Sequence, residues 1–270
     1  MVKKLLKHEF TYYIRIFGLF IPILLAIGVM TRVFLFFDNG NPINQLLISS
    51  SVLMLVLGCI ALMVLSTVVI ILRFYKNMYS AEGYLTFALP VSNSAHIFVK
   101  LFTALVCQAA CMLSVLLSAL IALSGENLIS TFHLLFCWVE EIFLEIGAFQ
   151  SIAFMIEIPL AILASAISTI LLYYTCITIG QTAKKNRVLL AVGAYFIYYS
   201  ASQTVLTILM IMLTVFASSA MFATFFNWLA ANPIPALHLL FSSMIAIYGG
   251  LSALFWFVTR KIMNKKLNLE

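Results

Sequence analysis

The side chains that could carry metal or redox chemistry are few and widely spaced. The cysteines are Cys59, Cys107, Cys111, Cys137 and Cys176, and no C-x-x-C motif occurs. Cys107 and Cys111 would share one face of a helix, but small buried cysteines are common in helices. The histidines are too scattered for a ligand set, and H-E-x-x-H is absent. We therefore expect no metal and no cofactor in this chain.

Motifs for hydrolysis and nucleotide binding are incomplete. Glu140 and Glu141 match the first half of the E-E-x-x-x-R pattern of intramembrane CAAX-type proteases, but Glu145 stands where the arginine belongs. No G-x-S-x-G occurs. The string that begins at Gly180 lacks the second glycine and the Lys-Ser/Thr pair of a phosphate loop. We expect no enzyme site and no ATP site here.

The elements that position these residues must be membrane helices. Of 270 residues, 64% are hydrophobic and 9% are charged, whereas soluble domains are about 45–50% apolar and about 25% charged. The net charge of +6 comes from short basic clusters between long apolar runs. It does not come from a basic stripe interleaved with aromatics, so we expect no nucleic-acid partner.

Six apolar runs have the length of membrane spans, which need roughly 20 residues each. The predicted spans are about 16–37, 46–72, 97–124, 152–180, 188–217 and 237–259. The first is too long for a signal peptide and no cleavage site follows it. We expect one all-α transmembrane domain over residues 1–270.

Fourteen of the fifteen Lys and Arg residues fall on one side of these spans, and only Arg32 falls on the other. The positive-inside rule therefore predicts that both termini are cytoplasmic. Glu157 is expected at the outer interface, with Pro159 in the first turn beyond it. The six spans are predicted to bury no charge, which argues against a proton- or sodium-driven carrier.

An amphipathic helix is predicted at residues 2–15, before the first span. Its apolar stripe includes Phe10, and its basic face includes Lys4, Lys7 and Arg15. Such a helix can lie flat on anionic cytoplasmic lipid. The alternative is that these lysines only anchor the topology.

The cytoplasmic loop 73–96 is predicted to contain a short helix. Ser80 suits its N-cap, Pro90 ends it, and Ser92 or Ser94 can cap the third span. This helix exposes apolar side chains in an aqueous compartment: Tyr84, Leu85, Phe87 and Leu89. Such a patch marks a partner surface or a membrane-lying segment.

Two outer segments are not predicted to span. The loop 125–151 favours an amphipathic helix on the outer leaflet, with a cation site at Glu140, Glu141 and Glu145 as the alternative. The stretch 218–236 is apolar but contains Pro233 and Pro235. It suits a short re-entrant or interfacial hairpin.

Three strings together resemble one family of transport proteins. They are KLLKHEF at 4–10, RFYKN at 73–77, and EGYLTFALPVS at 82–92 followed by Lys100-Leu101. They resemble permease subunits of ABC transporters of the ABC-2 exporter class, closest to a group common in Gram-positive bacteria. The resemblance implies a bacterial plasma-membrane protein with separate ABC ATPase subunits, which bind ATP and Mg, and a second permease subunit.

The resemblance also assigns site residues. The helix between the second and third spans would be the coupling helix that docks on the ATPase, with Glu82, Gly83, Tyr84, Leu85, Phe87, Leu89 and Pro90 as contact residues. The turn with Lys184, Lys185 and Arg187 would be a second contact. The cargo would be hydrophobic or amphipathic: an antimicrobial peptide, a drug or a lipid. The alternative is a non-transporting scaffold or immunity protein, or a divergent intramembrane protease.

Overall fold

The computed structural model describes residues 2–37, 40–80, 83, 92–124, 128–183, 185–216 and 219–265. Within these ranges the regular elements are α-helices: α1 (Val2–Phe36), α2 (Pro42–Tyr79), α4 (Asn93–Leu123), α5 (Leu128–Ile146), α6 (Ala148–Gly180), α7 (Arg187–Phe216), α8 (Ala220–Ala231) and α9 (Pro233–Lys265). Six of them, all except α5 and α8, are long and apolar enough to cross a membrane. The prediction of an all-α membrane protein with six spans is confirmed.

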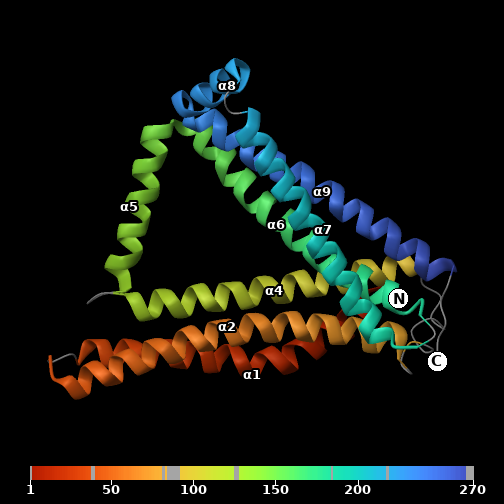
Figure 1. Cartoon of the computed structure of the whole chain (residues 1–270). Helices are drawn as coiled ribbons and strands as arrows, with labels where there is room; N and C mark the ends of the chain where they lie inside the picture. The colour runs from red at the N-terminus through yellow and green to blue at the C-terminus, as the bar shows by residue number, and fades with distance from the viewer. Residues whose placement is uncertain are drawn as a thin grey trace. The chain divides into compact units, whose positions relative to one another are not determined.

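The chain divides into two compact units. The first comprises Met1–Met78 and Leu85–Glu141, and the second comprises Tyr79–Tyr84 and Ile142–Glu270, so that α5 is shared between them. In the first unit α1, α2 and α4 run side by side, and α1 packs closely on α4 (Figure 1). In the second unit α6 packs closely on α9 and α7, and α8 packs on α9.

The helices are longer than the apolar runs that predicted them. Residues 2–15 and the first predicted span form one helix, α1, which continues through Pro22. Helix α2 extends past residue 72 to Tyr79 because its last turns pack inward, with Phe74 and Met78 at most 1% exposed. The loop predicted at 73–96 is correspondingly shorter, since α4 begins at Asn93 with Ser92 as its N-cap.

The two segments predicted not to span contain short helices. Helix α5 occupies most of the predicted outer loop, and α8 occupies most of the stretch 218–236. Pro233 does not interrupt the last span but begins it. Proline suits the first position of a helix, because its missing N–H would have no partner there and its φ angle is already helical.

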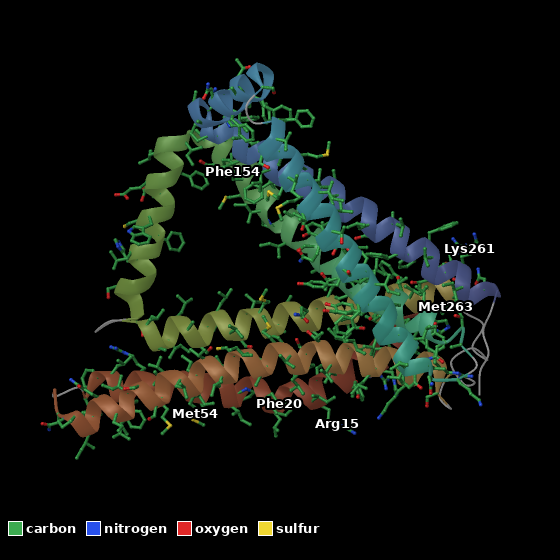
Figure 2. All side chains as sticks on the ribbon, viewed as in Figure 1. Arg15, Phe20, Met54, Phe154, Lys261 and Met263 are labelled. Atoms are coloured by element: carbon green, nitrogen blue, oxygen red, sulfur yellow. The ribbon has the colours of Figure 1, made fainter. Side chains whose placement is uncertain are left out.

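Apolar side chains cover the outside of the long helices (Figure 2). Helix α7 is the extreme case, with no buried residue. Polypeptide that exposes so many large apolar groups is stable only in contact with lipid or another apolar partner. Small residues permit the closest approaches between helices. A Cβ at Gly28 of α1 would lie 2.9 Å from the carbonyl oxygen of Ser118 in α4, the kind of contact that membrane helices use.

Candidate functional site

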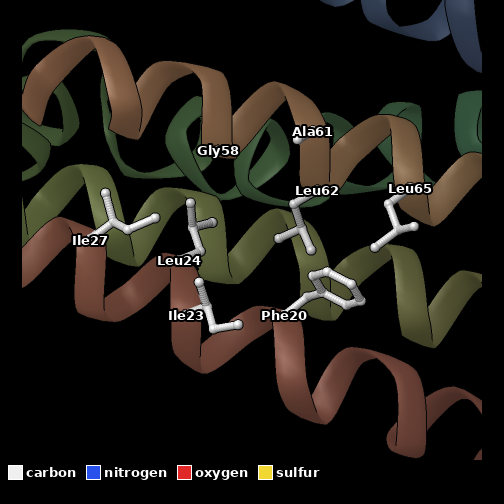
Figure 3. Close-up of a pocket in the computed structure, with 8 residues that line it drawn as sticks. All are labelled: Phe20, Ile23, Leu24, Ile27, Gly58, Ala61, Leu62 and Leu65. Atoms are coloured by element: carbon white, nitrogen blue, oxygen red, sulfur yellow. The ribbon is translucent and has the colours of Figure 1, made fainter. Parts of the chain in front are cut away.

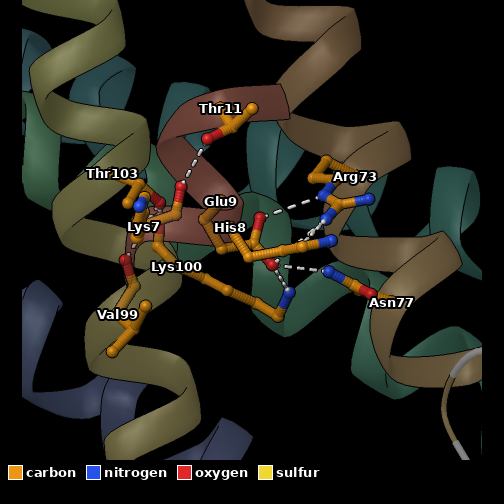
Figure 4. Close-up of polar contacts among 9 residues, drawn as sticks. All are labelled: Lys7, His8, Glu9, Thr11, Arg73, Asn77, Val99, Lys100 and Thr103. Carbon is orange, nitrogen blue, oxygen red and sulfur yellow. Dashed lines mark hydrogen bonds and ion pairs between the residues drawn. The ribbon is translucent and has the colours of Figure 1, made fainter. Parts of the chain in front are cut away.

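A cluster of ionised side chains joins the three long helices of the first unit (Figure 4). Glu9 of α1 lies at its centre. Arg73 Nε donates a hydrogen bond to Glu9 Oε2 over 2.9 Å, and Lys100 Nζ donates to Glu9 Oε1 over 3.0 Å. Asn77 Nδ2 also donates to Glu9 Oε1. We call Glu9, Arg73, Asn77 and Lys100 the Glu9 junction.

The Glu9 junction is almost completely shielded from its surroundings. Glu9 is 1% exposed, Lys100 is 3% exposed and Arg73 is 6% exposed. A buried ion is costly unless it is paired and hydrogen-bonded. Both carboxylate oxygens of Glu9 accept hydrogen bonds from cationic donors, which are stronger than neutral ones. The ion pairs of Glu9 with Arg73 and Lys100 therefore hold α1, α2 and α4 together.

Two further side chains contact the arginine of the junction. The guanidinium carbon of Arg73 lies 4.1 Å from the centre of the Tyr12 ring, a cation–π contact. His8 Nδ1 lies 3.4 Å from Arg73 Nη2. The N-terminal part of α1 thus surrounds Arg73 on several sides and fixes the end of α2.

The prediction that the spans bury no charge is wrong at Lys100, which lies in the predicted span 97–124, whereas Glu9 and Arg73 lie just outside the spans predicted at 16–37 and 46–72. The sequence places Arg73 and Lys100 at the ends of spans from their charge alone, and Glu9 on the inner side of the first span. In the structure, α1, α2 and α4 each place one charge on the face that meets the other two helices. The contacts connect residues 64 and 91 positions apart. No local periodicity reports such a pairing.

The apolar stripe of the predicted interfacial helix contacts protein. Tyr13 and Phe17 are 3% and 4% exposed, and the Phe10 ring lies edge-on to Phe102 of α4 with centroids 6.3 Å apart. Lys4, Lys7 and Arg15 are exposed. The predicted basic face of α1 is thus exposed, whereas its predicted apolar face packs against protein.

Most residues assigned to ATPase coupling lie outside the described residues: Glu82, Tyr84, Leu85, Phe87, Leu89, Pro90 and Lys184. Gly83 is buried and helical, and its N–H donates to the Ser80 carbonyl over 2.7 Å. Lys185 is exposed, and Arg187 is the first residue of α7. Between them Asn186 adopts a positive φ of 57°, a conformation that asparagine tolerates better than most residues.

A second polar cluster, in the other unit, joins α6 to α9. His238 Nδ1 lies 2.7 Å from Glu157 Oε2, and its Nε2 lies 2.6 Å from Gln150 Oε1. The His238 ring stacks on Phe154, with centroids 4.1 Å apart and planes 3° from parallel. Because α6 begins at Ala148, Pro159 lies inside the helix and not in its first turn. Glu157 therefore has a partner 81 residues away, which the sequence did not reveal.

Hydroxyl groups make the remaining contacts between α6 and α9. Thr175 and Thr259 are hydrogen-bonded over 2.9 Å, and Thr175 Oγ1 also lies 3.3 Å from the Phe255 carbonyl oxygen. In the same unit Tyr79 donates to Thr178 over 2.9 Å. Over the described part of the chain, no group of three His, Cys, Asp or Glu side chains could hold a metal ion.

Comparison of the chain with protein-family models, with curated proteins and with solved structures finds no match in any of the three. The resemblance to ABC-2 permeases therefore stays a prediction from the three sequence strings. The structure adds one feature that the sequence strings do not show, the Glu9 junction.

Proposed function

We propose that the chain is the transmembrane permease subunit of an ATP-driven ABC exporter. It would form a pathway for a hydrophobic or amphipathic substrate in a bacterial plasma membrane, with both termini cytoplasmic. A separate ATPase would supply the energy, and a second permease subunit would complete the pathway. Six helices of spanning length and the string EGYLTFALPVS support this proposal.

The observation that carries the proposal is the position of the Glu9 junction along the chain. Arg73 and Asn77 lie in the last two turns of α2, just before the loop that contains the proposed coupling residues. Lys100 lies two turns into α4, just after that loop. Both ends of the loop are thereby fastened to α1.

This arrangement suits the transmission of force from an external motor. A segment that an ATPase displaces must pull on helices that move together, and a packed ionic network is a stiff connection of that kind. A proton relay is the less suitable role. Relays need a carboxylate that protons can reach, whereas Glu9 is 1% exposed and both of its oxygens already accept hydrogen bonds.

A pull-down of the tagged full-length chain in mild detergent tests the proposal. We expect an ABC ATPase to co-purify, and we expect the double variant Tyr84→Ala, Phe87→Ala to lose it. Aromatic anchors at an interface commonly supply more than about 2 kcal/mol each, so the loss should exceed tenfold. The variant should still insert and elute as the wild type does.

The control is a second Phe and Tyr pair with the same spacing. Phe196 and Tyr199 of α7 are 65% and 53% exposed, and Phe196→Ala, Tyr199→Ala should retain the ATPase. If no ATPase co-purifies, or if the Tyr84 and Phe87 variant retains it fully, the exporter assignment is wrong. A scaffold, an immunity protein or an intramembrane protease would then be the better description.

A further inference from the structure

An apolar groove lies between α1 and α2 within the first unit (Figure 3). Its volume is about 300 Å³. Four residues of α1 and four of α2 line it: Phe20, Ile23, Leu24, Ile27, Gly58, Ala61, Leu62 and Leu65. Every one of these side chains is apolar or absent, so water would find no hydrogen-bond partner in the groove.

Polar contacts as well as buried apolar side chains hold α2 beside the groove, among them Ile70 and Phe74, which are 2% and 1% exposed. Ser66 donates to Gln108 of α4 over 3.2 Å, and Arg73 reaches Glu9 of α1. Between these attachments and the outer end of α2, small residues face α1. Gly58 permits a close approach to α1, since a Cβ there would lie 3.1 Å from Leu24 Cδ1, and Ala61 lines the groove with a small side chain.

The length of the groove along α1 is within the thickness of the hydrocarbon of one leaflet. Phe20 and Ile27 are seven residues apart, which is about 10 Å along a helix, whereas one leaflet contributes about 15 Å of hydrocarbon. Phe20 lies in the N-terminal half of the first predicted span, 16–37, and Ile27 lies at its middle. The groove would therefore be reached by acyl chains of the leaflet on the N-terminal side of that span.

The same two helices present positive charge beyond the N-terminal end of the groove. Lys7, Arg15 and Lys76 are exposed, and Arg15 stands five residues before Phe20, about 7.5 Å along α1. The acidic residue described in this part of the two helices, Glu9, is buried and paired. A ligand that extends from the groove toward this end meets cations at the surface.

We infer that the groove is a binding site for one acyl chain of an anionic phospholipid whose headgroup lies toward the N-terminal end of α1, where Arg15 and Lys76 are exposed. The apolar lining selects a hydrocarbon chain, and the exposed cations favour a negatively charged headgroup. The bound acyl chain fills the space between α1 and α2. This inference stands independently of the exporter assignment.

Native mass spectrometry of the full-length chain, with phosphatidylglycerol or phosphatidylcholine added at equal concentration, tests the site. We expect one phosphatidylglycerol to remain bound after the detergent has been stripped. Ala61→Phe fills the groove from an exposed position and should reduce that adduct at least fivefold. Ala61→Leu, a smaller addition, should reduce it less.

Two further variants separate this site from general lipid adhesion. Val56 is 52% exposed and lies on the opposite face of α2, so Val56→Phe should leave the adduct unchanged. The double variant Arg15→Gln, Lys76→Gln should lower the preference for phosphatidylglycerol over phosphatidylcholine at least threefold, with phosphatidylcholine binding unchanged.

Three results would overturn the inference. The first is an equal adduct in the wild type and Ala61→Phe, and the second is an equal loss in Val56→Phe and Ala61→Phe. The third is a change of oligomeric state in Ala61→Phe without any change in bound lipid, which would assign the groove to a second copy of the chain. Co-purification of an ATPase is a separate measurement, and its failure would not affect this test.

Discussion

Helices α2 and α7 are attached to their units in different ways, because α2 buries both apolar and ionised side chains whereas α7 buries none. Helix α2 reaches its neighbours through long polar side chains, with Arg73 and Asn77 bound to Glu9 and Ser66 bound to Gln108. Helix α7 has no buried residue. It contacts α6 by close backbone approach, since a Cβ at Gly180 would lie 2.7 Å from both Ala191 Cβ and the Arg187 carbonyl oxygen.

The two modes of attachment fail in different ways. An ionic attachment fails when one partner is neutralised, because the remaining charges stay buried without compensation. A close-packed attachment fails when an atom is added, because the neighbours must move apart. The close contact at Gly180 leaves no room for a side chain. The predictions below test this contrast.

The largest effect is expected for Glu9→Gln. The substitution leaves Arg73 and Lys100 buried without their anion, and breaking a buried ion pair in this way costs about 3–5 kcal/mol. Denaturant unfolding in detergent should show a loss of this size in the free energy of unfolding. Adding Lys100→Gln to the variant should restore part of it, because one uncompensated cation is removed.

Glu140→Gln is the matched control, since Glu140 is exposed on α5. It should leave the free energy of unfolding within about 0.5 kcal/mol of the wild type. Equal stability of Glu9→Gln and Glu140→Gln would contradict the ionic attachment of α2.

The second effect is expected for Gly180→Ala in the other unit. The added methyl group collides with Ala191 and with the Arg187 carbonyl oxygen, and overpacking of this kind costs about 1–3 kcal/mol. The same unfolding measurement should show it. Gly193→Ala has nothing within 4 Å of the new Cβ and should be neutral or stabilising, because alanine is the better helix former. A cost as large at Gly193 would remove the close-contact explanation.

A smaller effect is expected for Glu157→Gln between α6 and α9. The side chains of Glu157 and His238 are 25% and 22% exposed, so the pair resembles a surface pair more than the Glu9 junction. We expect a loss of at most about 1 kcal/mol in unfolding free energy. A loss equal to that of Glu9→Gln would show that burial does not set the difference between the two clusters.

The smallest effect is expected for Thr175→Val, which removes the hydroxyl pair with Thr259. Hydrogen bonds between membrane helices average about 0.6 kcal/mol, and the loss should be of that order by the same unfolding measurement. Thr204 bonds only within its own helix, to the Ser200 carbonyl, and is exposed. Thr204→Val should therefore change stability less than Thr175→Val does, and the reverse order would argue against this contact.

Predictions from the sequence are most accurate for features that depend on one helix alone. The six spanning helices followed from hydropathy, and Ser92 was correctly named as a possible cap of α4. The limits of helices were less accurate where packing extends them. Apolar periodicity does not show that Arg73 and Asn77 are buried, so α2 was predicted to end too early. Likewise Pro233 predicts a break, whereas in the structure it begins α9, because proline is compatible with the first position of a helix.

The sequence by itself determined that this is an all-α membrane protein, because 64% apolar residues in six long runs leave no other way to satisfy the backbone in lipid. Only the tertiary structure decided which charges are structural. Glu9, Arg73 and Lys100 look like ordinary residues near the ends of spans until three helices bring Arg73 and Lys100 within 3.0 Å of Glu9. Hydropathy is a sum over neighbours in the chain, whereas the energy of a buried ion depends on partners 64 and 91 residues away. Likewise, Glu157 and His238 are 81 residues apart in the chain, so the sequence does not reveal that they pair.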